Sequence, residues 1–131
     1  MKLETKKKKK KVLIIDDERD FTRLLVSVLE LHEEYEVCVQ NNSRLALATA
    51  QSFAPDIVIL DVVMPEFDGG QVHALFKEDA ALKNVPIIFL TSIVQENEVE
   101  RHQGVIGGSY YVAKPVSASR LISVIAEHLG P

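Results

Sequence analysis

The chain has a single cysteine, no long hydrophobic run and no recognisable secretion signal. Cys38 cannot form a disulfide within the chain, and its place between Val37 and Val39 predicts a small buried side chain rather than a reactive thiol. No apolar stretch approaches the roughly 18 residues that a membrane-spanning helix needs. The basic start is followed by a short apolar run, Val12–Ile15, too short for a signal peptide. These absences predict a soluble, cytoplasmic protein with no membrane span.

Charge is unevenly distributed along the 131 residues, whose net charge is −4. Residues 1–11 hold seven Lys and one Glu, for a net charge of +6, and the other 120 residues hold 8 basic and 18 acidic side chains, for −10. We therefore expect a basic, flexible leader over residues 1–11. The run Lys6–Lys11 could steer the chain to nucleic acid or anionic lipid, but a solvated leader is the simpler interpretation. The acidic body predicts no nucleic-acid binding by the domain itself.

The rest of the chain is long enough for one domain with one core, which we place at residues 12–130. Because 47% of the residues are hydrophobic, disorder of the whole chain is excluded. Short apolar runs predict five strands, at 12–15, 35–40, 57–60, 85–90 and 110–113. Helical spacing of apolar residues predicts helices at about 20–31, 45–50, 72–76 and 117–129, with a marginal helix near 95–103 and a flexible glycine connection at 104–108. This alternation predicts an α/β fold: a doubly wound parallel sheet with helices on both faces.

Polar residues follow four of the predicted strands. Asp16 and Asp17 follow the first, Asp61 follows the third, Thr91 ends the fourth and Lys114 follows the fifth. The carboxyl ends of parallel strands lie along one edge of a sheet, so we expect these side chains to meet. Three close carboxylates favour a hard divalent cation such as Mg²⁺. With the Lys114 ammonium, the set predicts phosphoryl transfer onto a carboxylate, with Asp61 as the nucleophile.

Together with Met64-Pro65, Asp68-Gly69 and Lys114-Pro115, these residues strongly resemble the receiver domain of bacterial two-component response regulators. Each motif is weak alone, but all of them occur in order over residues 11–130. The resemblance implies a five-stranded parallel sheet of order 2-1-3-4-5, a flavodoxin-like three-layer sandwich.

The resemblance also implies roles for single residues. Asp61 would be the phosphoacceptor, charged from a phosphohistidine. Asp17 would ligate Mg²⁺ directly, Asp16 mostly through water, and the backbone carbonyl of Val63 would complete the protein ligands.

Three further residues would respond to phosphorylation. Thr91 and Lys114 would hold the phosphoryl oxygens, and Tyr111 would turn inward when Thr91 moves. The Lys114–Pro115 peptide bond would be cis. The implied partners are a sensor histidine kinase or phosphotransfer protein and an unknown downstream protein, and a phosphorylation-dependent homodimer is compatible with this function.

Other functions remain open at this point. A pseudo-receiver would bind partners without phosphorylation, which the complete set of acceptor-site residues disfavours. A phosphatase with an aspartate nucleophile usually needs a second acid two residues later, where this chain has Val63. A nucleotide-binding domain is weaker still, because no glycine-rich phosphate loop follows the first strand.

Overall fold

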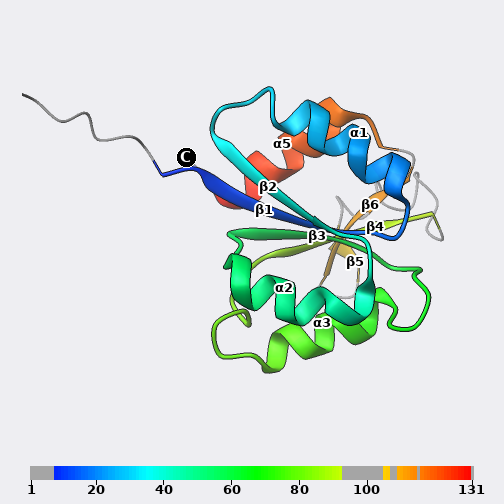
Figure 1. Cartoon of the computed structure of the whole chain (residues 1–131). Coiled ribbons are helices and arrows are strands. Elements are labelled where there is room, and N and C mark those ends of the chain that lie inside the picture. Colours follow the sequence, from blue (N-terminus) through cyan, green and yellow to red (C-terminus); the bar gives the residue numbers. More distant parts are fainter. Residues whose placement is uncertain (1–7, 93–104, 107–108, 115, 131) are drawn as a thin grey trace, which may run out of the picture.

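Short apolar runs form the strands of one sheet, and the segments between them form helices on both of its faces (Figure 1). The structure, a computed structural model, describes residues 8–92, 105–106, 109–114 and 116–130. The described elements, in chain order, are β1 (Lys10–Ile15), α1 (Arg19–Leu29), β2 (Tyr35–Gln40), η1 (Ser43–Leu45), α2 (Ala46–Phe53), β3 (Ile57–Asp61), α3 (Gly69–Glu78), β4 (Ile87–Thr91), β5 (Val105–Ile106), β6 (Ser109–Ala113) and α5 (Ala118–Leu129).

The strand order of the sheet is β2-β1-β3-β4-β6-β5. The first five of these pair in parallel, which confirms the predicted parallel sheet and its order, with β6 as the fifth predicted strand. The structure adds β5, which pairs antiparallel with β6 at the edge of the sheet. We expected only a flexible connection here, because two apolar residues between glycines are too short to be recognised as a strand.

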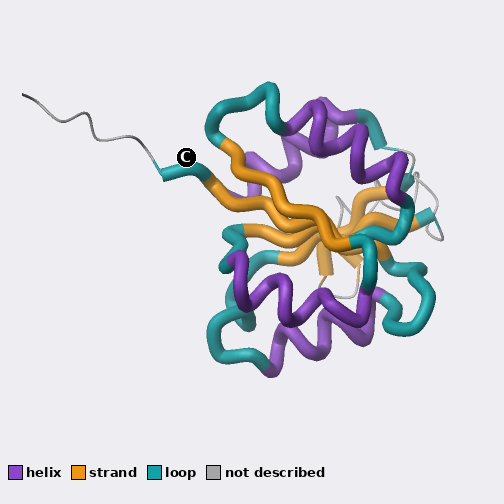
Figure 2. The backbone as a smooth tube through the Cα atoms, in the orientation of Figure 1, coloured by secondary structure: helices purple, strands orange, loops and turns teal. Residues whose placement is uncertain are grey.

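Alternate residues of the central strands face opposite layers of helices, as the pleat of a strand requires. In β3, Ile57 and Ile59 pack in one core cluster with buried residues of α1 and α5. Val58 and Leu60 pack in the other cluster with residues of α2 and α3. Figure 2 shows the sheet between these two helical layers. Each fully buried aliphatic side chain contributes roughly 1.5–3 kcal/mol, so these clusters are what holds the strand ends in place.

Several boundaries differ from the prediction. β1 begins at Lys10, so Lys10 and Lys11, which we assigned to the leader, belong to the sheet. The Lys11 amide donates to Asp56, and its ammonium donates to the carbonyl of Phe53, which fixes this start. The predicted helix near 95–103, the glycines at 104, 107 and 108, and the cis bond before Pro115 lie outside the described residues.

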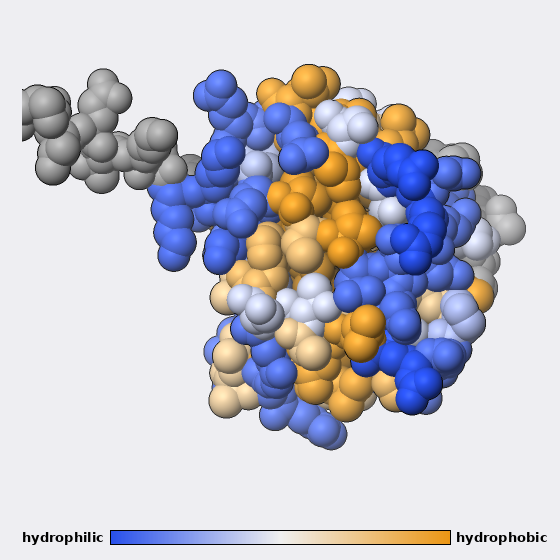
Figure 3. Space-filling model, in the orientation of Figure 1, coloured by the Kyte–Doolittle hydropathy of each residue, from blue (hydrophilic) through white to orange (hydrophobic). Residues whose placement is uncertain are grey.

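The outer surface is mixed. Figure 3 shows a band of hydrophobic side chains across the face that carries α1, β2 and α2, between hydrophilic flanks. The large hydrophobic residues left exposed in the described part of the chain are Leu24, Leu31, Leu45 and Val63. In that part of the chain, every helix is too short or too polar to span a bilayer.

Candidate functional site

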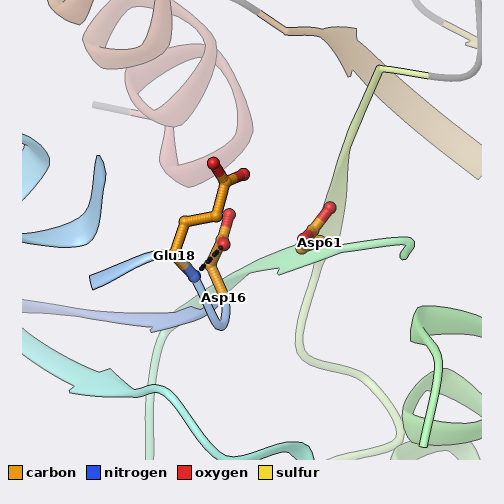
Figure 4. Close-up of side chains that lie close together, drawn as sticks. All are labelled: Asp16, Glu18 and Asp61. Carbon is orange, nitrogen blue, oxygen red and sulfur yellow. Dashed lines mark hydrogen bonds between the residues drawn. The ribbon is translucent and has the colours of Figure 1, made fainter. Parts of the chain in front are cut away.

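The carboxyl edge of the sheet brings together four of the residues predicted to form a site. Asp61 and Thr91 are the last residues of β3 and β4, and Asp16 directly follows β1. Because β1 pairs with β3 in parallel, Asp16 and Asp61 emerge side by side (Figure 4). The amide of Lys114 donates to the carbonyl of Thr91 at 2.8 Å, which attaches the end of β6 to the end of β4. The side chains of Asp16, Asp61 and Lys114 therefore meet as predicted, and Thr91 is joined to Lys114 through the backbone.

The Lys114 ammonium lies at the centre of this group. Its Nζ is 2.8 Å from Oδ2 of Asp16, 2.8 Å from Oε1 of Glu18 and 3.6 Å from Oδ2 of Asp61. The side chains of Lys114 and Asp61 are only 11% and 7% exposed, and that of Asp16 is fully buried, so water screens these charges weakly. One cation therefore neutralises part of a charge that three carboxylates share.

Burial raises the pKa values of Asp16 and Asp61. Desolvation is the main cause for Asp61, the charge of Asp16 adds to it, and attraction to Lys114 opposes it, so the pKa of Asp61 rises from 3.8 to about 6. Desolvation also raises the pKa of Asp16, against hydrogen bonding by Lys114 and by the amide of Glu18. Burial alone would lower the pKa of Lys114, but its bonds to Asp16 and Glu18 outweigh that effect and raise it.

Contacts of the loop after β3 hold the backbone of Asp61 in place. Gly69 is packed so closely that a Cβ atom would lie 2.5 Å from the carbonyl oxygen of Asp61, so only glycine fits without a shift. The Ser43 hydroxyl donates to the carbonyl of Pro65 and accepts from the amide of Phe67. A capping box between Asp68 and Gln71 then begins α3.

The other predicted residues lie around this centre. Asp17 is exposed and is not one of the three grouped carboxylates, although its charge raises the pKa of Asp61. The amide of Val63 donates to the Asp61 carboxylate, and residue Val63 as a whole is 55% exposed. Thr91 is buried. Tyr111 lies on β6 opposite Phe89, and the two rings stack with centroids 5.0 Å apart.

Sequence reasoning missed Glu18. In the part of the chain that the structure describes, the carboxylates of Asp16, Glu18 and Asp61 form a group whose oxygens lie within 4.8 Å of one another. The amide of Glu18 donates to Oδ1 of Asp16 at 2.9 Å across the bend at Asp17, and the two side chains lie on the same side, as Figure 4 shows. That two-residue spacing was the signal in the sequence that could have found it.

This arrangement fits a hard cation. Oδ2 of Asp16 is buried, and the contact that the described structure gives it is the Lys114 ammonium, 2.8 Å away. A buried oxygen of this kind, beside two further carboxylates, provides the oxygen ligands that Mg²⁺ takes. The acidic group can therefore hold a divalent cation close to Asp61.

Comparison with known proteins adds to this geometry. The sequence pattern of the response regulator receiver domain matches residues 12–126. The "Polar-differentiation response regulator DivK" of Brucella anthropi is 32% identical over 118 residues, which cover 89% of this chain and 94% of that protein.

Solved structures are similar as well. The chemotaxis protein CheY4 of Vibrio cholerae superposes with a TM-score of 0.78 at 27% identity, covering 92% of this chain and 99% of that one. A putative response regulator from Chloroflexus aurantiacus gives a TM-score of 0.77 at 27% identity, with 93% and 98% covered. The fold is thus shared over nearly the whole chain.

Proposed function

This chain belongs to the response regulator receiver domain family, and from that premise we propose that Asp61 accepts a phosphoryl group in a Mg²⁺-dependent reaction. A receiver domain is a signalling switch rather than a turnover enzyme. The charge added at Asp61 would change which protein the domain binds.

The transfer is a substitution at phosphorus. An oxygen of the Asp61 carboxylate forms a bond to the phosphorus of a phosphohistidine, and the P–N bond breaks with its electron pair returning to the imidazole. Bound Mg²⁺ supplies charge neutralisation for the phosphoryl oxygens. Asp16, Asp61 and the carbonyl of Val63 would hold it together with Asp17, which is exposed but whose charge already raises the pKa of Asp61.

The observation that carries this proposal is the position of Lys114. A nearly buried ammonium within 3.6 Å of the Asp61 carboxylate provides a positive charge where phosphoryl oxygens would develop negative charge. Thr91 ends the neighbouring strand and is joined to Lys114 through the backbone. We propose that both residues bind the phosphoryl group, and that Thr91 and Tyr111 move with it.

The test is phosphorylation with a small donor. Incubation with Mg²⁺ and acetyl phosphate should add one phosphate to the intact chain, measured by mass spectrometry, and Asp61→Asn should add none. Asp20→Asn, which removes an exposed carboxylate on α1, is the matched control and should be phosphorylated normally. Absence of any added phosphate in the wild-type chain would instead support a pseudo-receiver that acts as a phosphorylation-independent interaction module.

The proposed partners follow from this chemistry. A sensor histidine kinase or phosphotransfer protein would supply the phosphoryl group in the cytoplasm, and a downstream protein or a second copy of the chain would bind the phosphorylated form. We propose that the domain runs from Lys10, the first residue of β1, to residue 130, and that the lysines before Lys10 form a leader outside the site.

A further inference from the structure

The Lys114 ammonium is held nearer to the acids that follow β1 than to Asp61. It is 2.8 Å from both Asp16 and Glu18, but 3.6 Å from Asp61. Phosphoryl oxygens bonded to Asp61 would draw this ammonium towards β3. The contacts that hold it on the β1 side therefore oppose that movement.

Glu18 is one of these contacts, and among the described residues its carboxylate has no partner other than Lys114. It occupies the N-cap position of α1, yet its side chain makes no capping hydrogen bond. Its Oε1 instead accepts a hydrogen bond from Lys114, 96 residues away in sequence. The side chain is 63% exposed, so the rest of the fold does not depend on it.

Phe21, in the first turn of α1, supplies a second and uncharged contact. The Lys114 Nζ lies 4.6 Å from the centroid of its ring, within the range of a cation–π interaction. Phe21 packs against the core cluster below α1 and α5, which fixes the ring. The start of α1 therefore contacts the ammonium through a carboxylate and through an aromatic face.

We propose that Glu18 and Phe21 are positioning residues that restrain Lys114 beside Asp16 in the unphosphorylated protein, and that loosening this restraint speeds phosphorylation of Asp61. The inference rests on the proposed function and adds a rate-setting contact to it. With acetyl phosphate, the Asp61 oxygen bonds to phosphorus, the bond from phosphorus to the acetate oxygen breaks, and acetate leaves with the electron pair. Lys114 takes part only through its charge.

The experiment compares three variants at saturating Mg²⁺. Glu18→Gln removes the charged contact, Phe21→Leu removes the ring without changing charge, and Glu30→Gln removes an exposed carboxylate at the other end of α1 as the matched control. The rate constant of phosphorylation by acetyl phosphate should rise about two- to five-fold in the first two variants and stay unchanged in Glu30→Gln.

Phe21→Leu distinguishes loss of the restraint on Lys114 from loss of negative charge near Asp61. If only the lost negative charge mattered, Glu18→Gln would be faster and Phe21→Leu would match the wild type, which would overturn the proposal. If Glu18 served as a metal ligand instead, Glu18→Gln would weaken Mg²⁺ binding by calorimetry and would be no faster at saturation, which would also overturn it.

A spectroscopic measurement keeps the inference separate from the proposed function. The Lys114 ammonium resonance should shift and exchange faster with water in Glu18→Gln and in Phe21→Leu, but not in Glu30→Gln. Unchanged ammonium resonances would refute the restraint even if Asp61 is phosphorylated. A wild-type chain that takes no phosphate would refute the proposed function, and the resonances would still decide whether the restraint exists.

Discussion

Strand β3 contains two environments within five residues. Ile57 to Leu60 are fully buried and apolar, and the next residue, Asp61, carries a carboxylate on a side chain that is only 7% exposed. Burial stabilises the fold in the first case, because apolar surface leaves water. In the second case burial raises the free energy of the charged form, which is why the pKa of Asp61 rises to about 6.

The same contrast recurs on β1, where buried Ile15 is followed by buried Asp16. Both strands therefore place a carboxylate where it is unfavourable, held there by the apolar residues just before it. An arrangement of this kind persists when the surrounding structure stabilises it, and it is typical of functional sites. In each strand, the buried apolar residues stabilise the fold, and the carboxylate that follows them belongs to the candidate site.

The largest expected effect on stability comes from a substitution in the apolar part of β3. Leu60→Ala removes fully buried methyl groups and leaves a cavity between β3 and the helices α2 and α3, so unfolding should cost about 2–5 kcal/mol less than in the wild type. Urea titration measures this difference. Leu31→Ala, at a position that is 80% exposed, is the matched control and should change stability by less than about 0.5 kcal/mol. Equal losses would show that β3 is not the core strand.

The next effect concerns the Lys114 ammonium, which contacts Asp16, Glu18 and Asp61. Lys114→Met leaves three carboxylates without their positive partner, so stability at pH 7 should fall by about 3 kcal/mol. The pKa values of Asp16 and Asp61 are already raised, and both would take up protons on acidification, so the loss should shrink towards pH 4. Urea titrations at both pH values, with exposed Lys83→Met as the control, test this. A loss that is independent of pH would mean that Lys114 stabilises the fold by packing alone.

The two parts of the strands differed in how well the sequence predicted them. Continuous apolar runs such as Ile57–Leu60 are buried on both faces, and that pattern alone predicted the parallel sheet. The meeting of Asp61 with Lys114 was predictable from the shared direction of parallel strands. The short strand β5 was not, because two residues carry no periodicity.

Side-chain direction at the site was harder to predict than position. We expected Asp17 beside Asp16, but Asp17 lies at a bend and is exposed, and Glu18 joins the group instead. The contact between Glu18 and Lys114 depends on the rotamers of two long side chains, which spacing in the sequence does not encode.

A smaller effect tests how closely the loop after β3 fits the end of the strand. Gly69→Ala would place a Cβ atom 2.5 Å from the Asp61 carbonyl oxygen and 2.8 Å from Cα of Val62, both of them backbone atoms. We expect a loss of about 2 kcal/mol in stability and slower phosphorylation, because the backbone that carries Asp61 must shift. Gly70→Ala is the matched control, since its Cβ atom would meet only a side-chain oxygen of Asp68, at 3.3 Å. Equal behaviour of the two variants in urea titration would show that the loop is not fitted to Asp61.

The smallest expected effect is a gain in stability when the carboxylate of Asp61, at the end of β3, is removed. The raised pKa means that folded Asp61 holds its proton more tightly than the unfolded chain does, so its contribution to stability falls as the pH rises from 3.8 through about 6. Asp61→Asn removes this cost. It should be about 1–2 kcal/mol more stable than the wild type at pH 7, below the limit of about 3 kcal/mol that the pKa sets, since the carboxylate lies at the sheet edge. The gain should vanish below pH 4, and exposed Asp17→Asn should show little of it. Urea titrations across this range measure the difference; a variant that is less stable at pH 7 would mean that the Asp61 carboxylate stabilises the fold.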